Sequence, residues 1–170
     1  MIRATSSIAT NAQLAARSVE VDLKNYDDDE RHDPARRHGS GRPRVLSYWR
    51  TVPAEEFDNA FKAEVTAFVR GTTTTIPEWR RAIAGDTAAA IAMVIDCKSP
   101  DAIGIKVDFA MTVLLACAFD DPAAALVLSI KLRQMPLAAR LREQLAISWL
   151  VANMLSCLKR STPPRKGQQV

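Results

Sequence analysis

The sequence predicts an all-α fold, a compact bundle or short solenoid of about five to six helices. Ala and Leu dominate the apolar residues, which make up 48% of the chain, whereas aromatic residues make up only 6%. No long run alternates β-branched or aromatic residues with polar ones, as a half-buried strand would. Apolar residues instead recur at steps of three and four, the period of helices packed on a core. A length of 170 residues suits one such domain with appended segments.

The most apolar stretch is 109–119 (FAMTVLLACAF), in which Thr112 is the one polar residue. As a helix it would be apolar on every side, so we expect it at the centre of the core. The other residues that we expect to be buried come from several predicted helices between 76 and 160. Together with Phe109 they are Trp79, Leu114, Leu128, Leu141 and Trp149.

Helix boundaries are predicted from prolines, capping residues and glycines. A helix over about 53–70 starts at Pro53 and ends at Gly71, because Pro suits a first turn and Gly a carboxyl-terminal cap. Thr75 and Glu78 have the spacing of a capping box, which predicts a helix that carries Trp79, Ala82 and Ile83 inward. Further helices are predicted after four other signals, namely Asp86, Ser99-Pro100, Asp121-Pro122 and Pro136, the last helix running to about Arg160.

The flanking segments differ in composition from this domain, which we place at 45–160. Segment 1–25 is rich in Ser, Thr and Ala over 1–19 and contains no acid before Glu20. It fits a marginal helix, an organellar transit peptide or an uncleaved export signal. Segment 26–44 is a charged linker with Pro and Gly, and 161–170 is a tail after Pro163 and Pro164, so we expect both to be disordered. Without an apolar signal segment or a run long enough to span a membrane, a cytoplasmic protein is expected, with export by a non-Sec route or an organelle as alternatives.

Two stretches of the domain align with each other at an offset of 35 residues, GDTAAAIAMVI (85–95) and DDPAAALVLSI (120–130). Each is followed by a proline, Pro100 or Pro136, so each unit reads as a helical hairpin. The period and the order of small residue, turn, Ala-rich helix and proline resemble tetratricopeptide-type repeats over about 76–155. This resemblance implies a short helical solenoid, and a plain orthogonal helical bundle is the alternative.

The sequence shows no catalytic or metal-binding constellation, so we expect a protein that is not an enzyme and has no cofactor. Both histidines, His32 and His38, lie in the predicted linker, and no phosphate-binding loop, nucleophile elbow or zinc motif occurs. The three cysteines lie inside apolar helical patterns, which predicts buried thiols. Asp108 precedes the most apolar segment; we interpret it as facing solvent or pairing locally, the alternative being a pocket shared with Lys106.

Two classes of function remain open. The first is a protein–protein interaction module, such as an adaptor, a chaperone or a secreted effector-like protein, because apolar residues cover more than one face of the last helix. Its partner would be another protein or a second copy of the chain, and the expected contact residues are Trp149, Met154, Leu155 and Leu158. The alternative is a nucleic-acid-associated protein that binds through the Arg-rich segment 31–50. Its expected contact residues are Arg36, Arg37, Arg42, Arg44, Tyr48, Trp49 and Arg50.

Overall fold

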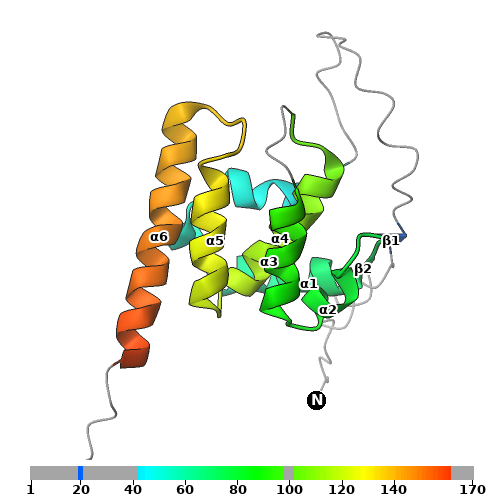
Figure 1. Cartoon of the computed structure of the whole chain (residues 1–170), viewed down its shortest axis with the longest axis horizontal. Coiled ribbons are helices and arrows are strands. Elements are labelled where there is room, and N and C mark those ends of the chain that lie inside the picture. Colours follow the sequence, from blue (N-terminus) through cyan, green and yellow to red (C-terminus); the bar gives the residue numbers. More distant parts are fainter. Residues whose placement is uncertain (1–18, 21–41, 98–101, 162–170) are drawn as a thin grey trace, which may run out of the picture.

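The computed structural model describes residues 19–20, 42–97 and 102–161, and the fold is all-α, as predicted (Figure 1). Two strands of two residues each, β1 (Val19–Glu20) and β2 (Thr72–Thr73), pair in parallel, with Val19 opposite Thr72. The predictions for 1–18, for the linker up to residue 41 and for the tail from residue 162 lie outside the described residues. The helices in chain order, with η marking a 3-10 helix, are η2 (Arg44–Arg50), η3 (Ala54–Glu56), α1 (Asn59–Gly71), α2 (Trp79–Ile83), α3 (Thr87–Asp96), α4 (Ile105–Ala118), α5 (Pro122–Leu132) and α6 (Ala139–Ser161).

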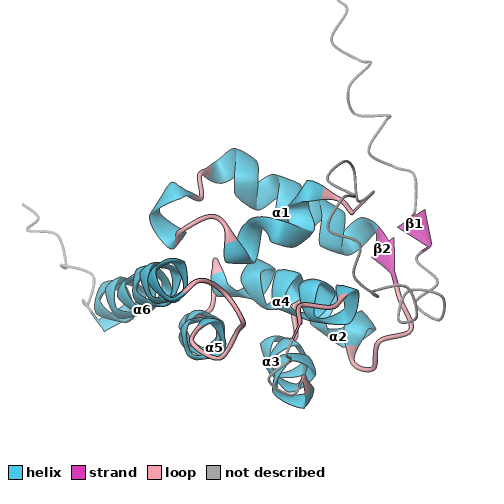
Figure 2. Ribbon diagram, turned by 90° about the horizontal axis from the view of Figure 1, so that it is seen from above, coloured by secondary structure: helices cyan, strands magenta, loops and turns pink. Residues whose placement is uncertain are grey.

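Helix α4 is the centre of the fold, as its sequence predicts. All of its residues are buried except Lys106, Ala116 and Cys117. Helix α1 packs on one side of α4, whereas α3 and α5 pack on the other, and η2 covers it as well (Figure 2). A helix that is apolar all round must be surrounded, because each exposed face would leave apolar surface in water.

Helix α6 lies at one edge of the molecule, where it packs on α5 and η3 (Figure 2). Hydrogen bonds to both neighbouring elements help to fix its position. The Ser129 hydroxyl of α5 donates to the backbone oxygen of Ala146 at 2.7 Å. The backbone N–H of Ala54 in η3 donates to the Ser148 hydroxyl at 3.0 Å. Only the side of α6 that faces α5 and the core is therefore covered by other described elements.

Two of the predicted helix starts are confirmed. The Asp86 carboxylate accepts from the backbone N–H of Ala89 at 3.0 Å and caps α3. The Asp121 carboxylate accepts from the N–H of Ala123 at 2.8 Å, and Pro122 occupies the first turn of α5. In both cases the side chain satisfies a backbone donor that has no partner within the helix.

Other boundaries differ from the predictions. The helix expected over 53–70 is divided into η3 and α1, because Asp58 adopts an extended backbone and its carboxylate caps α1 at the N–H of Phe61. The capping box is absent: Glu78 has a left-handed backbone with φ of 64° and its carboxylate pairs with Arg81, so α2 begins only at Trp79. Ile83 is half-buried, whereas Trp79 and Ala82 are buried as predicted.

The two remaining predicted starts are also displaced. Helix α4 begins at Ile105 after Gly104, later than the predicted start at Ser99-Pro100, which lies outside the described residues. Helix α6 begins at Ala139 and not at Pro136. Among the residues predicted to be buried, Leu141 is half-buried and the others are buried. Of the cysteines, Cys157 is exposed and the other two are partly exposed, which corrects the prediction of three buried thiols.

Candidate functional site

The outer side of α6 carries a stripe of exposed apolar side chains, which we call the α6 stripe. It consists of Ile147, Val151, Met154, Leu155 and Leu158. About half of each side chain or more is exposed, from 47% for Ile147 to 64% for Leu158. Ile147, Val151, Met154 and Leu158 follow one another at intervals of four, three and four residues, and Leu155 lies four residues after Val151. These intervals place all five side chains on one side of the helix. No charged residue occurs in α6 between Glu143 and Lys159.

A groove of about 510 Å³ runs along this stripe where α6 meets η3. Ile147, Val151 and Leu155 line its α6 side, and Ala54 and Glu55 line the η3 side. The groove is therefore mostly apolar, with one carboxylate at its edge. It gives the α6 stripe a concave margin of the kind that receives an apolar side chain.

The apolar surface continues from α6 onto α5. The two helices are antiparallel at their seam, since Ser129 is bonded to Ala146 and Asn153 is bonded to Pro122. Ser129 and Ala146 face each other where the two helices meet. The next residue on each helix, Ile130 or Ile147, is rotated by about 100° about its helix axis. In an antiparallel pair this rotation places both on the same side, and both are exposed. The exposed surface is therefore a two-helix face.

Trp149 is not part of this face, which corrects the prediction that it anchors a partner. Its side chain is 2% exposed and packs against the rings of Phe57 and Phe119. It lies two positions from Ile147 and Val151 on the helix, a rotation of about 200°, and so it faces the core. Its indole N–H is buried without a hydrogen-bond partner among the described residues.

The structure also gathers charged residues around Asp108, in the first turn of α4. The carboxylate is fully buried, and its Oδ1 accepts from the indole N–H of Trp49 at 3.1 Å. Its Oδ2 accepts from the guanidinium of Arg50 at 3.3 Å, and the guanidinium of Arg42 lies 3.6 Å away. Asp108 therefore pairs with residues far away in the sequence, contrary to the expectation of solvent exposure or a local partner. Lys106 is exposed and lines a different pocket.

Burial dominates the electrostatics of this cluster. It raises the pKa of Asp108 above its ordinary value, because removing an ionised carboxylate from water is costly. The charges of Arg50 and Arg42 and the Trp49 hydrogen bond oppose this rise. The Arg50 guanidinium also lies over the Trp49 ring, 5.8 Å from the ring centre. These contacts hold η2 and residue 42 against α4.

The residues predicted to bind nucleic acid fall into three groups. Arg36 and Arg37 lie outside the described residues. Tyr48 and Trp49 are buried in the core, so neither ring is accessible for stacking on a base, which corrects that prediction. Arg42, Arg44 and Arg50 line one pocket of about 360 Å³ together with Asp108. The sequence places these arginines in one segment, but their convergence on Asp108 could not be predicted from local spacing.

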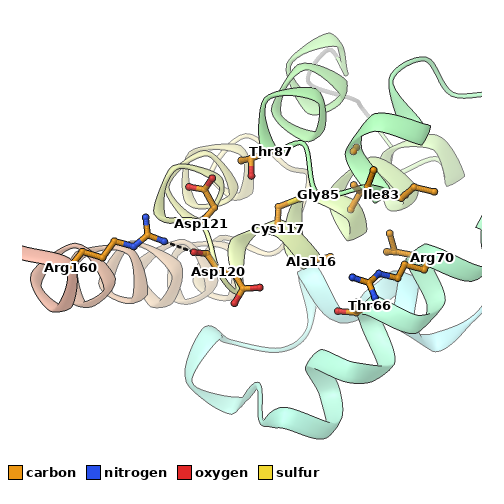
Figure 3. Close-up of a pocket in the computed structure, with 14 residues that line it drawn as sticks. Thr66, Arg70, Ile83, Gly85, Thr87, Ala116, Cys117, Asp120, Asp121 and Arg160 are labelled. Carbon is orange, nitrogen blue, oxygen red and sulfur yellow. Dashed lines mark hydrogen bonds between the residues drawn. The ribbon is translucent and has the colours of Figure 1, made fainter.

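A further pocket of about 270 Å³ lies between α1, the turn before α3 and the end of α4 (Figure 3). Cys117 faces it, with Asp120 and Asp121 nearby, and the guanidinium of Arg160 donates to the backbone oxygen of Asp120 at 2.6 Å. Burial and then the charges of the neighbouring aspartates raise the pKa of the Cys117 thiol. The thiol is therefore held protonated, the opposite of what a nucleophilic cysteine requires.

Two further classes of site were sought in the described part of the chain. No group of three or more His, Cys, Asp or Glu side chains there could hold a metal ion. None of the helices in 42–97 and 102–161 is long and apolar enough to cross a membrane. No family model, no curated protein and no solved structure matches the chain.

Proposed function

We propose that this domain binds a helix of another protein molecule through the α6 stripe, and that the molecule is either a different protein or a second copy of the chain. The observation that carries the proposal is the exposure of five large apolar side chains along one side of a helix that other described elements cover only on its opposite side. Apolar surface gathered in this way on a soluble helix is typical of interaction sites.

The spacing of the stripe supports a helix as the partner. Ile147, Val151, Met154 and Leu158 follow one another at four, three and four residues, the spacing of the seam in a two-stranded coiled coil. The absence of charge between Glu143 and Lys159 removes the desolvation penalty that buried charges would add to such a contact. Leu155 and the groove beside η3 extend the contact beyond a single seam.

Single charged substitutions on the stripe test this proposal. Met154→Glu and Val151→Glu would each place a carboxylate in the contact, whereas both positions tolerate charge in the isolated domain because they are exposed. The matched control is Ile95→Glu, whose apolar side chain is exposed to a similar extent on α3, a helix that lies apart from α6 (Figure 2). Sedimentation equilibrium would report self-association, and circular dichroism melts would report folding.

The proposal predicts that α6-dependent association is lost in both stripe variants and kept in the control, while all three variants retain the native melting temperature within a few degrees. Unfolding of Met154→Glu would instead assign the stripe to the core. If the native chain is monomeric and also yields no partner whose binding depends on the stripe, the interaction proposal fails. The arginine segment would then become the leading candidate.

A further inference from the structure

The pocket beside Asp108 has a surplus of positive charge. Three arginines line it, Arg42, Arg44 and Arg50, and Asp108 is the one acid among the described residues of its lining. With Arg42 left aside, one carboxylate cannot neutralise the guanidinium groups of both Arg44 and Arg50, so the described lining keeps a surplus of positive charge. The Ser47 side chain lies in the same lining and adds a hydroxyl group, which donates to the backbone oxygen of Arg44 at 2.7 Å.

The buried carboxylate of Asp108 holds one of these arginines, Arg50, in a fixed orientation. Both oxygens of Asp108 accept hydrogen bonds, from Trp49 and from Arg50, so the carboxylate serves as a fixed internal counter-charge. Arg50 is held between this carboxylate and the face of the Trp49 ring. A guanidinium carries five N–H donors, and the described residues engage only one nitrogen of Arg50, Nη2. Arg50 is thus oriented before any ligand arrives, which lowers the entropic cost of binding.

We propose that this pocket binds a phosphate group, either as free phosphate or as the terminal phosphate of a small phosphate monoester. Arginine is suited to this role, because its planar fork donates two hydrogen bonds to the oxygens of one phosphate. Arg44 is exposed at the pocket and supplies a guanidinium that bonds to none of the described residues, while Arg50 supplies the pre-oriented one. A volume of about 360 Å³ admits the phosphate and part of the group that carries it.

This inference is independent of the α6 stripe. The pocket is formed by residues 42–50 and the first turn of α4, whereas α6 packs on α5 and η3. It also differs from the nucleic-acid alternative, since Tyr48 and Trp49 are buried and offer no stacking surface beside the arginines. A single pocket for one phosphate group is therefore favoured over a track for a nucleic-acid strand.

The experiment is a titration of the full chain, followed by the amide chemical shifts of residues 44–50 at constant chloride concentration. Inorganic phosphate and phenyl phosphate are the two probes, and they separate free phosphate from a monoester as the ligand. An oligonucleotide without terminal phosphates is the third probe, and it tests whether the pocket binds the backbone of a nucleic-acid strand. The variant Arg44→Gln removes a guanidinium with no side-chain bond in the described structure. Arg80→Gln on α2 is the matched control, because Arg80 is also exposed and lines none of the pockets described above.

The proposal predicts saturable binding of at least one phosphate probe, weakened about tenfold by Arg44→Gln and less than twofold by Arg80→Gln. Arg44→Lys should restore part of the affinity, since it keeps the charge but not the fork. No saturable binding of either phosphate probe would overturn the proposal. Equal weakening by both glutamine variants would also overturn it, because it would indicate only general charge screening. Binding of the oligonucleotide alone would overturn it in favour of the nucleic-acid alternative.

Discussion

At the scale of single residues, two buried tryptophans differ in what their indole N–H groups contact. Trp49 donates to the Asp108 carboxylate, whereas the N–H of Trp149 has no partner among the described residues. Both side chains are buried and both contribute apolar area to the core. A buried donor without an acceptor has lost its bonds to water and gained none, which costs roughly 1–3 kcal/mol. The same substitution at the two positions would remove nearly the same side-chain volume, so a difference in stability between the variants would reflect the hydrogen bond.

Replacing each tryptophan with phenylalanine should give unequal losses of stability. Trp49→Phe leaves a buried carboxylate oxygen without its donor, whereas Trp149→Phe removes a donor that had no partner. We expect the free energy of unfolding to fall by roughly 1–3 kcal/mol more for Trp49→Phe. Urea denaturation of the two variants measures this difference. Equal losses, or a larger loss at Trp149, would mean that the Trp49–Asp108 bond adds no stability.

The raised pKa of Asp108 predicts the direction in which its contribution to folding stability changes with pH. A carboxyl group whose pKa is higher in the folded protein binds more protons there than in the unfolded chain. Its contribution to stability is therefore fully present below the unfolded-state pKa, near pH 4, and is lost as the pH rises through the folded-state pKa.

Asp108→Asn isolates this contribution, because the amide oxygen still accepts from Trp49 while the titration is removed. The difference in unfolding free energy, native protein minus Asp108→Asn, should increase as the pH is lowered from 7 towards 4. Urea denaturation at several pH values measures it. A difference that stays constant over this range, or decreases towards pH 4, would show that the arginines outweigh burial at this carboxylate.

At the scale of elements, the helices whose starts were predicted correctly are those with local capping. Asp86 and Asp121 each bond to a backbone N–H two or three residues ahead, so the signal and its effect lie within one turn. The Thr75–Glu78 pattern failed because a competing local partner was available. Arg81 binds the Glu78 carboxylate at 2.7 Å, and Thr74 instead of Thr75 bonds to the backbone N–H of Ile76.

The cap of α5 can be tested against a neighbouring aspartate. Asp121→Ala removes the acceptor for the Ala123 N–H and should lower the free energy of unfolding by about 1 kcal/mol. Asp120→Ala is the control, because the structure uses its backbone oxygen and not its carboxylate as an acceptor. Thermal melts of both variants measure the contrast. A loss at Asp120 as large as that at Asp121 would indicate a general charge effect and not a cap.

The α6 stripe shows where prediction from periodicity reaches its limit. The excess of apolar residues between Leu145 and Leu158 correctly indicates that α6 is apolar on more than one side. It does not show which side is covered, since that depends on where α5 and η3 pack. The predicted contact residues therefore include Trp149, which lies in the core. They do not include Ile147 and Val151, which are exposed.

At the scale of the whole molecule, the fold has a helix at its centre that is buried along most of its length, and a helix at its edge with one exposed side. Helix α4 is covered by α1, α3, α5 and η2, and its buried residues fix the all-α architecture that its sequence predicts. The Asp108 cluster could not be predicted in the same way, because Trp49 and Arg50 are 59 and 58 residues away along the chain. Only packing η2 onto α4 brings them together.

The central claim is that the α6 stripe contacts another protein molecule, and site-specific photo-crosslinking tests it most directly. A photoreactive amino acid is introduced at Met154 in the full chain, and a matched chain carries it at Ile95, which is exposed to a similar extent on α3. After irradiation, the account predicts one discrete protein adduct from position 154, a dimer of the chain or a single heterologous species, and no such adduct from position 95. No adduct from position 154, or the same adducts from both positions, would contradict it.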